Sequence, residues 1–140
     1  MGIALITGGA KRLGSYIAVA LAKMGYDIII HYNNSAKEAK ILQKNIINNI
    51  DGKCHLIKAD LTDIVQIQNL TSEVKKNFKG WNLLINNASI FSKSDFLNSS
   101  AAEFQNNFDI HLKAPMILTK EFHSHCLNSQ IEGNIINMID

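Results

Sequence analysis

The sequence has few of the features that mark secreted, metal-binding or membrane proteins. Its two cysteines, Cys54 and Cys126, are far apart and form no Cys-x-x-Cys pair, so neither a disulfide framework nor a zinc site is expected. The first residues, MGIALITGG, contain no basic region or cleavage-like site, and their apolar run is too short to span a bilayer. We therefore expect a cytoplasmic protein with reduced thiols, no bound metal and no membrane partner.

Charge of one sign is not concentrated anywhere in the chain. The 14 basic and 12 acidic residues are spread along it, with no basic run and no alternation of aromatic and basic residues. Nucleic acid is therefore not expected as a partner.

The 140 residues, 46% hydrophobic and 19% charged, are typical of a soluble globular protein. We expect one domain, residues 1–140.

Short apolar segments rich in β-branched residues recur along the chain and predict strands. They are residues 2–8, 26–32, 53–60, 81–88 and 133–140. Continuous apolar runs are typical of strands covered on both faces, which predicts a parallel sheet. Apolar residues at helical spacing follow each of the first four strands. These are Leu13, Ile17, Leu21 and Met24; Ala39, Leu42, Ile46 and Ile50; Ile64, Ile67, Leu70, Val74 and Phe78; and Phe104, Phe108, Leu112, Leu118 and Phe122.

Residues that start helices support this pattern. Capping residues are predicted at Ser35 with Glu38, at Ser100 with Glu103, and at Thr62 or Asp63. The single proline, Pro115, lies inside the fourth helical segment and is expected to kink it. Strands and helices that alternate in this order predict a doubly wound α/β fold of the Rossmann type, with a parallel sheet and right-handed crossovers.

The first predicted strand runs into a glycine-rich segment, Thr7-Gly8-Gly9-Ala10-Lys11-Arg12-Leu13-Gly14. Ligands of doubly wound sheets bind at the carboxyl ends of the strands, and glycines there allow a tight turn and close backbone approach. The helix that follows offers free N–H groups to a phosphate, and Arg12 adds a fixed charge with directional donors. The segment predicts a phosphate site; an ordinary glycine-rich turn is the alternative.

The second predicted strand ends in His31-Tyr32-Asn33-Asn34-Ser35, without a carboxylate to bind the adenosine ribose hydroxyls of NAD. The Ser35 hydroxyl, the amide donors and nearby Lys11 suit the 2′-phosphate of NADPH. His31 is either part of this site or a strand-end histidine without a function.

Several segments together resemble one family. TGGAKRLG resembles the T-G-x-x-x-G-x-G signature of short-chain dehydrogenases and reductases, with Arg12 in place of the middle glycine as in pteridine reductases. HYNNSAKEA is similar to the corresponding pteridine reductase segment, although that family often has a basic residue where Asn34 stands. Asn86-Asn87-Ala88-Ser89 resembles its N-N-A-S form, and NMID at the chain end resembles N-M-[VI]-D. The resemblance implies an NADPH-dependent reductase that transfers hydride to a dihydropterin-type substrate.

The same resemblance implies roles for individual residues. Substrate contacts fall on Arg12, Ser89 and Phe91, and proton delivery falls on Asp140. The implied cofactor-binding residues are Thr7, Gly8, Lys11, Arg12, Leu13, Gly14, His31, Tyr32, Asn33, Ser35, Asp60, Leu61, Asn87, Ala88 and Ser89. His111 stands where other members carry a structural Asn, as in the dihydromonapterin reductase branch. Four of these residues have plain structural alternatives: Asp60 as a helix cap, Phe91 in the core, His111 as an ordinary helix residue and Asp140 at a solvated end.

The Tyr-x-x-x-Lys dyad of the family is expected after Asp140, and Tyr16, Tyr26 and Tyr32 have no Lys four residues later. We therefore expect a domain truncated at its C-terminal side and inactive alone. Its expected protein partner is a complementing C-terminal half or a second copy of the chain. A nucleotide-binding or interaction module without catalytic activity is the alternative function.

Overall fold

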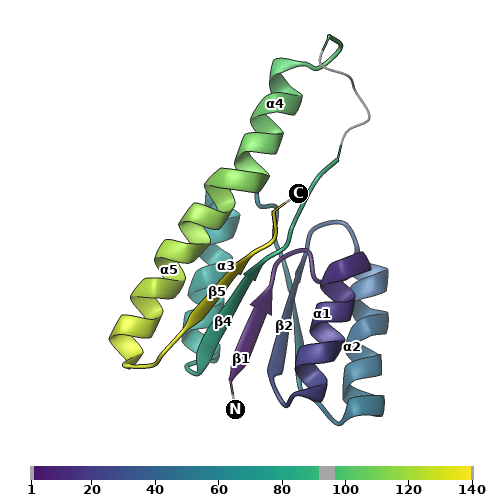
Figure 1. Ribbon diagram of the computed structural model, residues 1–140, viewed down its shortest axis with the longest axis vertical. Helices are drawn as coiled ribbons and strands as arrows, with labels where there is room; N and C mark the ends of the chain where they lie inside the picture. Colours follow the sequence, from purple (N-terminus) through teal and green to yellow (C-terminus); the bar gives the residue numbers. More distant parts are fainter. Residues whose placement is uncertain (1, 92–96, 140) are drawn as a thin grey trace.

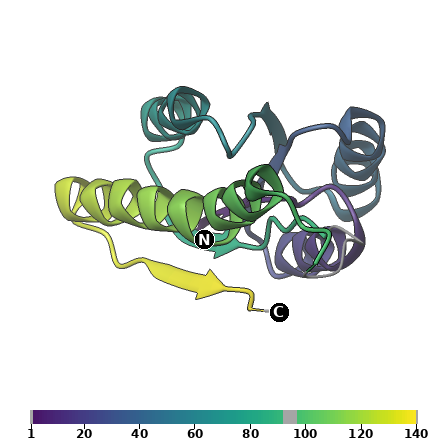
Figure 2. The same cartoon turned by 90° about the horizontal axis from the view of Figure 1, so that it is seen from above.

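A parallel sheet forms the middle of three layers (Figures 1 and 2). Within residues 2–91 and 97–139, which the computed structural model describes, the sheet has five strands. They are β1 (Ile3–Ile6), β2 (Asp27–Tyr32), β3 (Cys54–Lys58), β4 (Trp81–Asn86) and β5 (Asn134–Asn137). The helices are α1 (Arg12–Lys23), α2 (Ala36–Ile50), α3 (Ile64–Asn77), α4 (Ala101–Phe108), the π-helical turn η1 (Asp109–Lys113) and α5 (Ala114–Ser129).

The strand order is β3-β2-β1-β4-β5, and every neighbouring pair is parallel. The order reverses direction at β1, which pairs with β2 on one side and β4 on the other. This arrangement confirms the predicted doubly wound Rossmann-type sheet. The strands are shorter than the predicted segments; β1 ends at Ile6 because the glycine-rich turn begins directly after it.

The two faces of the sheet carry separate cores. On the face covered by α3 and α5, Trp81 and Phe122 are buried and their rings meet edge to face at 4.8 Å. The Trp81 indole N–H donates to the Leu83 carbonyl at 3.0 Å, so its polar atom is satisfied. The other face is covered by α1 and α2 (Figure 2), and its core contains Ile6, Ile30 and other apolar residues.

Helix α1 contacts the sheet through small residues. Gly14, Ala18 and Ala22 are its buried positions, whereas Leu13 and Met24 of the predicted apolar repeat are 53% and 70% exposed. Ile17 and Leu21 of the same repeat are half-buried against this core, so spacing predicted the helix correctly and its buried face only in part. Small residues let the α1 backbone lie close to the end of β1, which matters for the site described below.

The predicted helix caps have different outcomes. Asp63 accepts from the backbone N–H groups of Val65 and Gln66, and Ser100 forms a complete capping box with Glu103. The capping box predicted at Ser35 is wrong, because its side chain makes no cap hydrogen bond. Its intended partner, Glu38, instead pairs with Lys11 at 3.3 Å.

The fourth helical segment is irregular just before Pro115. The π-helical turn η1 joins α4 to α5 without a break, and Pro115 is the second residue of α5. Asp109 and Lys113 form an ion pair of 2.6 Å across η1, and the Lys113 ammonium holds the pKa of Asp109 below its ordinary value.

In the part of the chain that the structure describes, no helix is long and apolar enough to cross a membrane.

Candidate functional site

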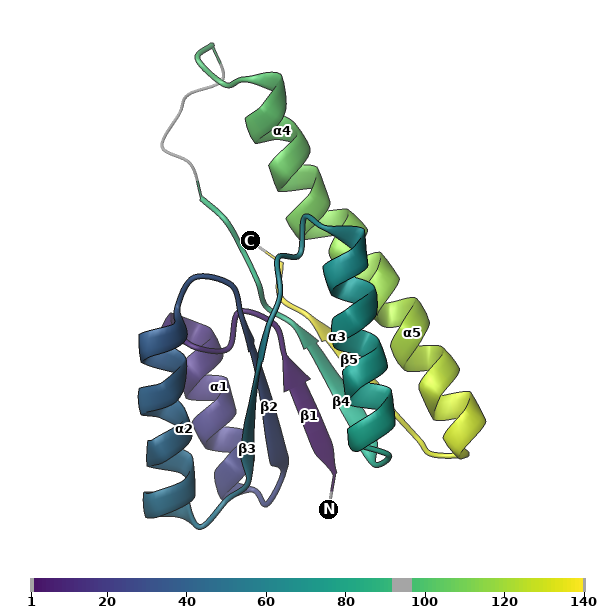
Figure 3. The same ribbon diagram turned by 180° about the vertical axis from the view of Figure 1, so that it is seen from behind.

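The turns that follow β1, β2 and β4 lie at the same end of the sheet (Figure 3). Most of the residues predicted to form a site belong to these turns. Because β1 and β4 are neighbours at the point where the strand order reverses, their ends are the expected position for a ligand.

Thr7 joins the end of β1 to the end of β4. Its side chain is 1% exposed, and its hydroxyl oxygen accepts from the N–H groups of Asn87 at 2.9 Å and Ala88 at 3.0 Å. The same hydroxyl donates to the Ile85 carbonyl at 3.3 Å. Thr7 therefore fixes the backbone of Asn87 and Ala88, two residues predicted to line the cofactor.

Asn87 closes the glycine-rich turn from the opposite side. Its side-chain nitrogen donates to the carbonyl oxygens of Thr7 at 2.9 Å and Gly8 at 3.2 Å. Both contacts are to protein backbone, and they hold the turn against β4. Thr7, Gly8, Asn87 and Ala88 thus come together as one hydrogen-bonded unit.

Two glycines are required by the geometry of this unit. Gly8 has φ +60°, a left-handed conformation that glycine adopts without strain. A Cβ atom on Gly14 would lie 2.6 Å from both the Gly8 carbonyl oxygen and the Asn87 side-chain nitrogen. Gly14 therefore allows the first turn of α1 to lie against the turn that precedes it.

The start of α1 has the character of an anion site. No acidic residue occupies its first turn, and its N-cap residue, Lys11, makes no side-chain cap bond. The first N–H groups of a helix have no partners within the helix, and the helix dipole adds positive potential there. Arg12 follows with φ +49°, an unusual conformation for a non-glycine residue, and its carbonyl accepts from the Ser15 hydroxyl at 2.7 Å. Lys11 and Arg12 place two cations at this helix end.

The segment after β2 meets the same region through Lys11. Tyr32, Asn33 and Ser35 are half-buried. The Lys11–Glu38 ion pair brings the Lys11 ammonium to the first turn of α2, which begins after Ser35. The Lys11 ammonium is among the causes that lower the pKa of Glu38, after a backbone hydrogen bond. The Ser35 hydroxyl, which makes no cap bond, lies at the same helix start.

The segment after β3 is mainly structural. One carboxylate oxygen of Asp60 accepts from the N–H of Thr62 at 2.9 Å and from its hydroxyl at 2.8 Å, which stabilises the turn into α3. Leu61 is 3% exposed and belongs to the core under α3, so a ligand contact from Leu61 would involve its backbone.

The residues predicted to meet a substrate lie on the surface after β4. Ser89 is exposed and Phe91 is 85% exposed, which excludes a core position for the Phe91 ring. The His111 ring contacts the Ile90 carbonyl at 3.3 Å and so links η1 to this segment. Asp140, predicted to deliver a proton, lies outside the described residues.

Sequence reasoning missed a pair of bonded amides beside this surface, of which Asn86 is buried and Asn137 is exposed. The Asn86 side-chain nitrogen donates to the Asn137 side-chain oxygen at 2.8 Å, joining the ends of β4 and β5. The Asn86 Oδ1 atom is buried without a hydrogen-bond partner among the described residues. A polar residue at the end of each strand was the available indication, but only the sheet order makes them neighbours.

The fold and this site together define the class of protein. A parallel sheet ordered β3-β2-β1-β4-β5, with a glycine-rich turn at the reversal point, is a Rossmann-type α/β domain. More particularly, the chain belongs to the short-chain dehydrogenase family, whose family model matches residues 2–139.

Individual relatives agree with this assignment. Galactitol 2-dehydrogenase from Agrobacterium fabrum is 32% identical over 136 residues, covering 97% of this chain and 51% of that protein. The structure of FolM alternative dihydrofolate reductase 1 from Brucella canis, complexed with NADP, is 32% identical with a TM-score of 0.87 and covers 99% of this chain and 55% of its own. A short-chain dehydrogenase from Sphingobium yanoikuyae in complex with NADPH shares the fold, with a TM-score of 0.89 at 20% identity, over 98% of this chain and 52% of its own. The chain spans about half the length of the curated relatives it matches.

Proposed function

We propose that the chain is the NADPH-binding part of a short-chain reductase that acts on a dihydropterin-type substrate. The observation that carries the cofactor proposal is the position of Lys11 beside the start of α2, where the Ser35 hydroxyl makes no cap bond and residues 31–35 contain no carboxylate. A 2′-phosphate there would meet the Ser35 hydroxyl and the Lys11 ammonium, which would exchange its exposed contact with Glu38 for the phosphate. The likeness to an NADP-complexed structure at 32% identity supports the same cofactor.

In this proposal the ends of β1, β2 and β4 would hold the cofactor. The first turn of α1, which contains Leu13 and Gly14, would bind the pyrophosphate together with Arg12. Tyr32, Asn33 and Ser35 meet the adenosine ribose and its phosphate, Asp60 and Leu61 border the adenine, and Ala88 and Ser89 continue the surface toward the nicotinamide. Bound NADPH would supply the hydride.

The substrate proposal depends on residues at the edge of this surface. The exposed Phe91 ring offers a face on which a flat heterocycle can stack, and Arg12 and Ser89 offer polar contacts. Asp140 would deliver the proton that accompanies hydride transfer. The likeness to the Brucella alternative dihydrofolate reductases, at 32% identity for both, is one support for a pterin-like substrate. Because galactitol 2-dehydrogenase is equally identical, the choice of substrate depends on the Arg12, Ser89 and Phe91 side chains.

A binding module without turnover is the second candidate, because the 140 residues contain no tyrosine followed four residues later by lysine. The two candidates differ in one experiment. Purified chain and NADPH are incubated with a dihydropterin, with and without a segment that supplies the dyad, and absorbance of NADPH is followed. If the chain is part of a reductase, NADPH should be oxidised once that segment is added. If the chain binds NADPH but no oxidation occurs in either case, the chain is a binding module without catalytic activity.

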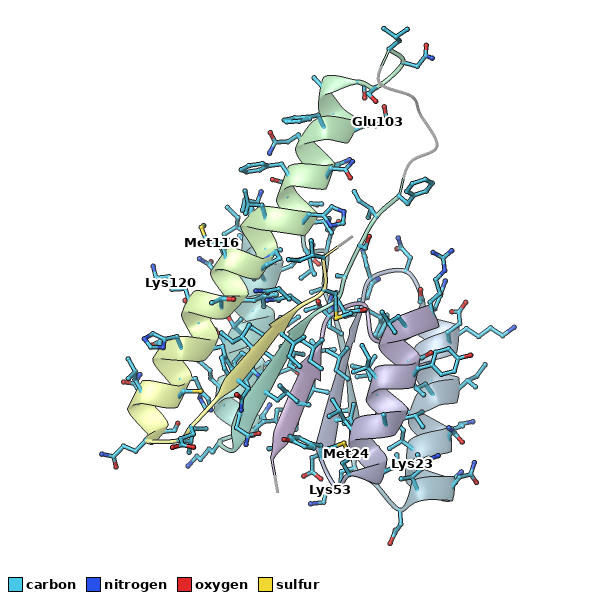
Figure 4. All side chains as sticks on the ribbon, viewed as in Figure 1. Lys23, Met24, Lys53, Glu103, Met116 and Lys120 are labelled. Atoms are coloured by element: carbon cyan, nitrogen blue, oxygen red, sulfur yellow. The ribbon has the colours of Figure 1, made fainter. Side chains whose placement is uncertain are left out.

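Two exposed surfaces support protein partners. On the outer side of α4 and α5, Phe104, Phe108, Leu112 and Met116 are 46–72% exposed at four-residue intervals, and Met116 points away from the sheet (Figure 4). This stripe suits contact with a second copy of the chain. The edge strand β5 is exposed along its length, beside a hollow of about 340 Å³ lined by Phe122, Cys126 and Ile135. That edge suits a complementing segment, from the rest of a longer protein or from another polypeptide.

The cofactor proposal predicts a selective loss of affinity in Lys11→Gln. Removing the ammonium should weaken NADPH binding roughly tenfold, about 1.4 kcal/mol, and leave NADH binding nearly unchanged. Calorimetric titration with both cofactors measures the ratio. Lys23→Gln is the matched control, because Lys23 is at the opposite end of α1 (Figure 4) and should leave both affinities unchanged. An equal loss for NADPH and NADH would contradict a 2′-phosphate contact.

A further inference from the structure

His31 connects three neighbouring strand ends. It is the fifth residue of β2 and only 2% exposed. The Gly8 backbone N–H, in the turn after β1, donates to its Nδ1 atom at 3.1 Å. Its Nε2 atom lies 3.0 Å from the Ala59 carbonyl oxygen, just after β3. The ring thus bridges the glycine-rich turn and the third strand.

These two contacts determine the form of the ring. A nitrogen that accepts a hydrogen bond carries no proton, so the ring is neutral and its proton is on Nε2, which donates to the Ala59 carbonyl. Burial lowers the pKa of His31 to about 4, although the Ala59 carbonyl and the nearby Asp60 carboxylate both favour protonation. Lys11, the cation in the adjacent turn, is paired with Glu38.

The same residue also holds the next amide of the turn. The Gly9 N–H donates to the His31 backbone carbonyl at 3.1 Å. Residue 31 therefore takes up the N–H groups of both Gly8 and Gly9, which cannot then donate to a phosphate. The amides left for an anion are those of the first turn of α1, and their direction depends on how the preceding turn is held.

We propose that His31 is a positioning residue. As the Nε2-protonated tautomer it fixes Gly8 in its left-handed conformation and so aims the first-turn amides of α1 at the cofactor phosphate, without touching the cofactor itself. This role rests on the proposed cofactor site, and it replaces the direct cofactor contact expected from the sequence.

Two substitutions separate the two ring contacts. In His31→Asn, the side-chain oxygen falls near the place of Nδ1 and can accept from the Gly8 N–H, but no atom reaches Ala59. In His31→Gln, the longer side chain can donate to the Ala59 carbonyl, but it has no acceptor at the place of Nδ1. Affinity for NADP⁺ should stay within roughly threefold of wild type in the Asn variant and fall roughly tenfold or more in the Gln variant. The stability of both variants is measured alongside, by denaturant unfolding.

A pH profile gives an independent readout. Because the folded-state pKa of His31 is lowered to about 4, its contribution to the free energy of unfolding is complete above about pH 6.5 and is lost as the pH falls toward 4. The ring of the folded protein itself becomes protonated only as the pH approaches 4, and an effect on binding is expected there. A protonated ring donates from both nitrogens and cannot accept from Gly8. NADP⁺ binding should therefore weaken more steeply on acidification in wild type than in His31→Asn. The cofactor phosphate also titrates, but it does so equally with both proteins, so the difference between their pH profiles reports on His31.

Amide exchange without cofactor completes the test. The Gly8 N–H should exchange slowly in wild type and in His31→Asn, and quickly in His31→Gln, as followed by NMR of the ¹⁵N-labelled chain. If wild type binds neither NADP⁺ nor NAD⁺, the proposed function fails, and the Gly8 exchange pattern still decides whether His31 sets the turn. Equal Gly8 exchange in all three proteins would overturn the proposal. So would equal NADP⁺ affinity in the two variants when wild type binds NADP⁺.

Discussion

Gly14→Ala is expected to abolish measurable cofactor binding. The added Cβ would lie 2.6 Å from the Gly8 carbonyl oxygen and 2.9 Å from the Gly9 Cα, both backbone atoms of the turn that holds the start of α1. Backbone cannot rotate away as a flexible side chain can, so α1 must shift outward from the sheet. A shift of this kind turns the first-turn amides of α1 away from the proposed phosphate site. Overpacking of this size also lowers the free energy of unfolding by about 1–3 kcal/mol.

The measurements are NADPH titration and urea unfolding of the same preparation. Gly80→Ala is the matched control, because a Cβ there would meet only Ile3 side-chain carbons at 3.6 and 3.8 Å, an ordinary contact. It should bind cofactor as wild type does. If Gly14→Ala bound NADPH with unchanged affinity, the close approach of α1 to the turn would not be what shapes the site.

The order of strands and helices could be predicted from the sequence because the information is local. Apolar runs and helical spacing are properties of neighbouring residues, and so is the Ser100 capping box. Burial within a helix is less local. Leu13 and Met24 look like core residues by spacing, yet the buried positions of α1 are Gly14, Ala18 and Ala22. At Gly14 the reason is the adjacent turn, whose backbone leaves no room for a Cβ atom.

The hydrogen bonds that hold the site together could not be predicted, because the residues that form them are distant in the sequence. Thr7 and Asn87 are hydrogen-bonded to each other although they are 80 positions apart, and no local pattern reports such a contact. Their expected cofactor contacts stay predictions. The capping box predicted at Ser35 is wrong for a similar reason, because Glu38 forms an ion pair with Lys11 of the glycine-rich turn. Sequence patterns pointed to residues at the strand ends, and the tertiary structure shows which of them hold the glycine-rich turn in shape.

Thr7→Val should cause a large loss of stability although it leaves the side-chain volume nearly unchanged. Valine has the shape of threonine without its hydroxyl, so the N–H groups of Asn87 and Ala88 lose their acceptor and the Ile85 carbonyl loses a donor. Thr7 is 1% exposed, and water cannot replace the hydroxyl unless the strand ends separate. Buried amides without partners cost roughly 1–3 kcal/mol each, so we expect a loss of about 3 kcal/mol in denaturant unfolding.

Thr7→Ser separates the hydroxyl from the methyl group. Serine keeps the acceptor for both amides and removes only one buried methyl, so its loss should be about 1 kcal/mol and its NADPH affinity close to wild type. The Val variant should bind NADPH more weakly even at temperatures where it is fully folded, because Asn87 and Ala88 are no longer fixed beside the turn. A Val variant as stable as the Ser variant would show that the strand ends hold together without this hydroxyl, and that packing of β1 against β4 alone shapes the site.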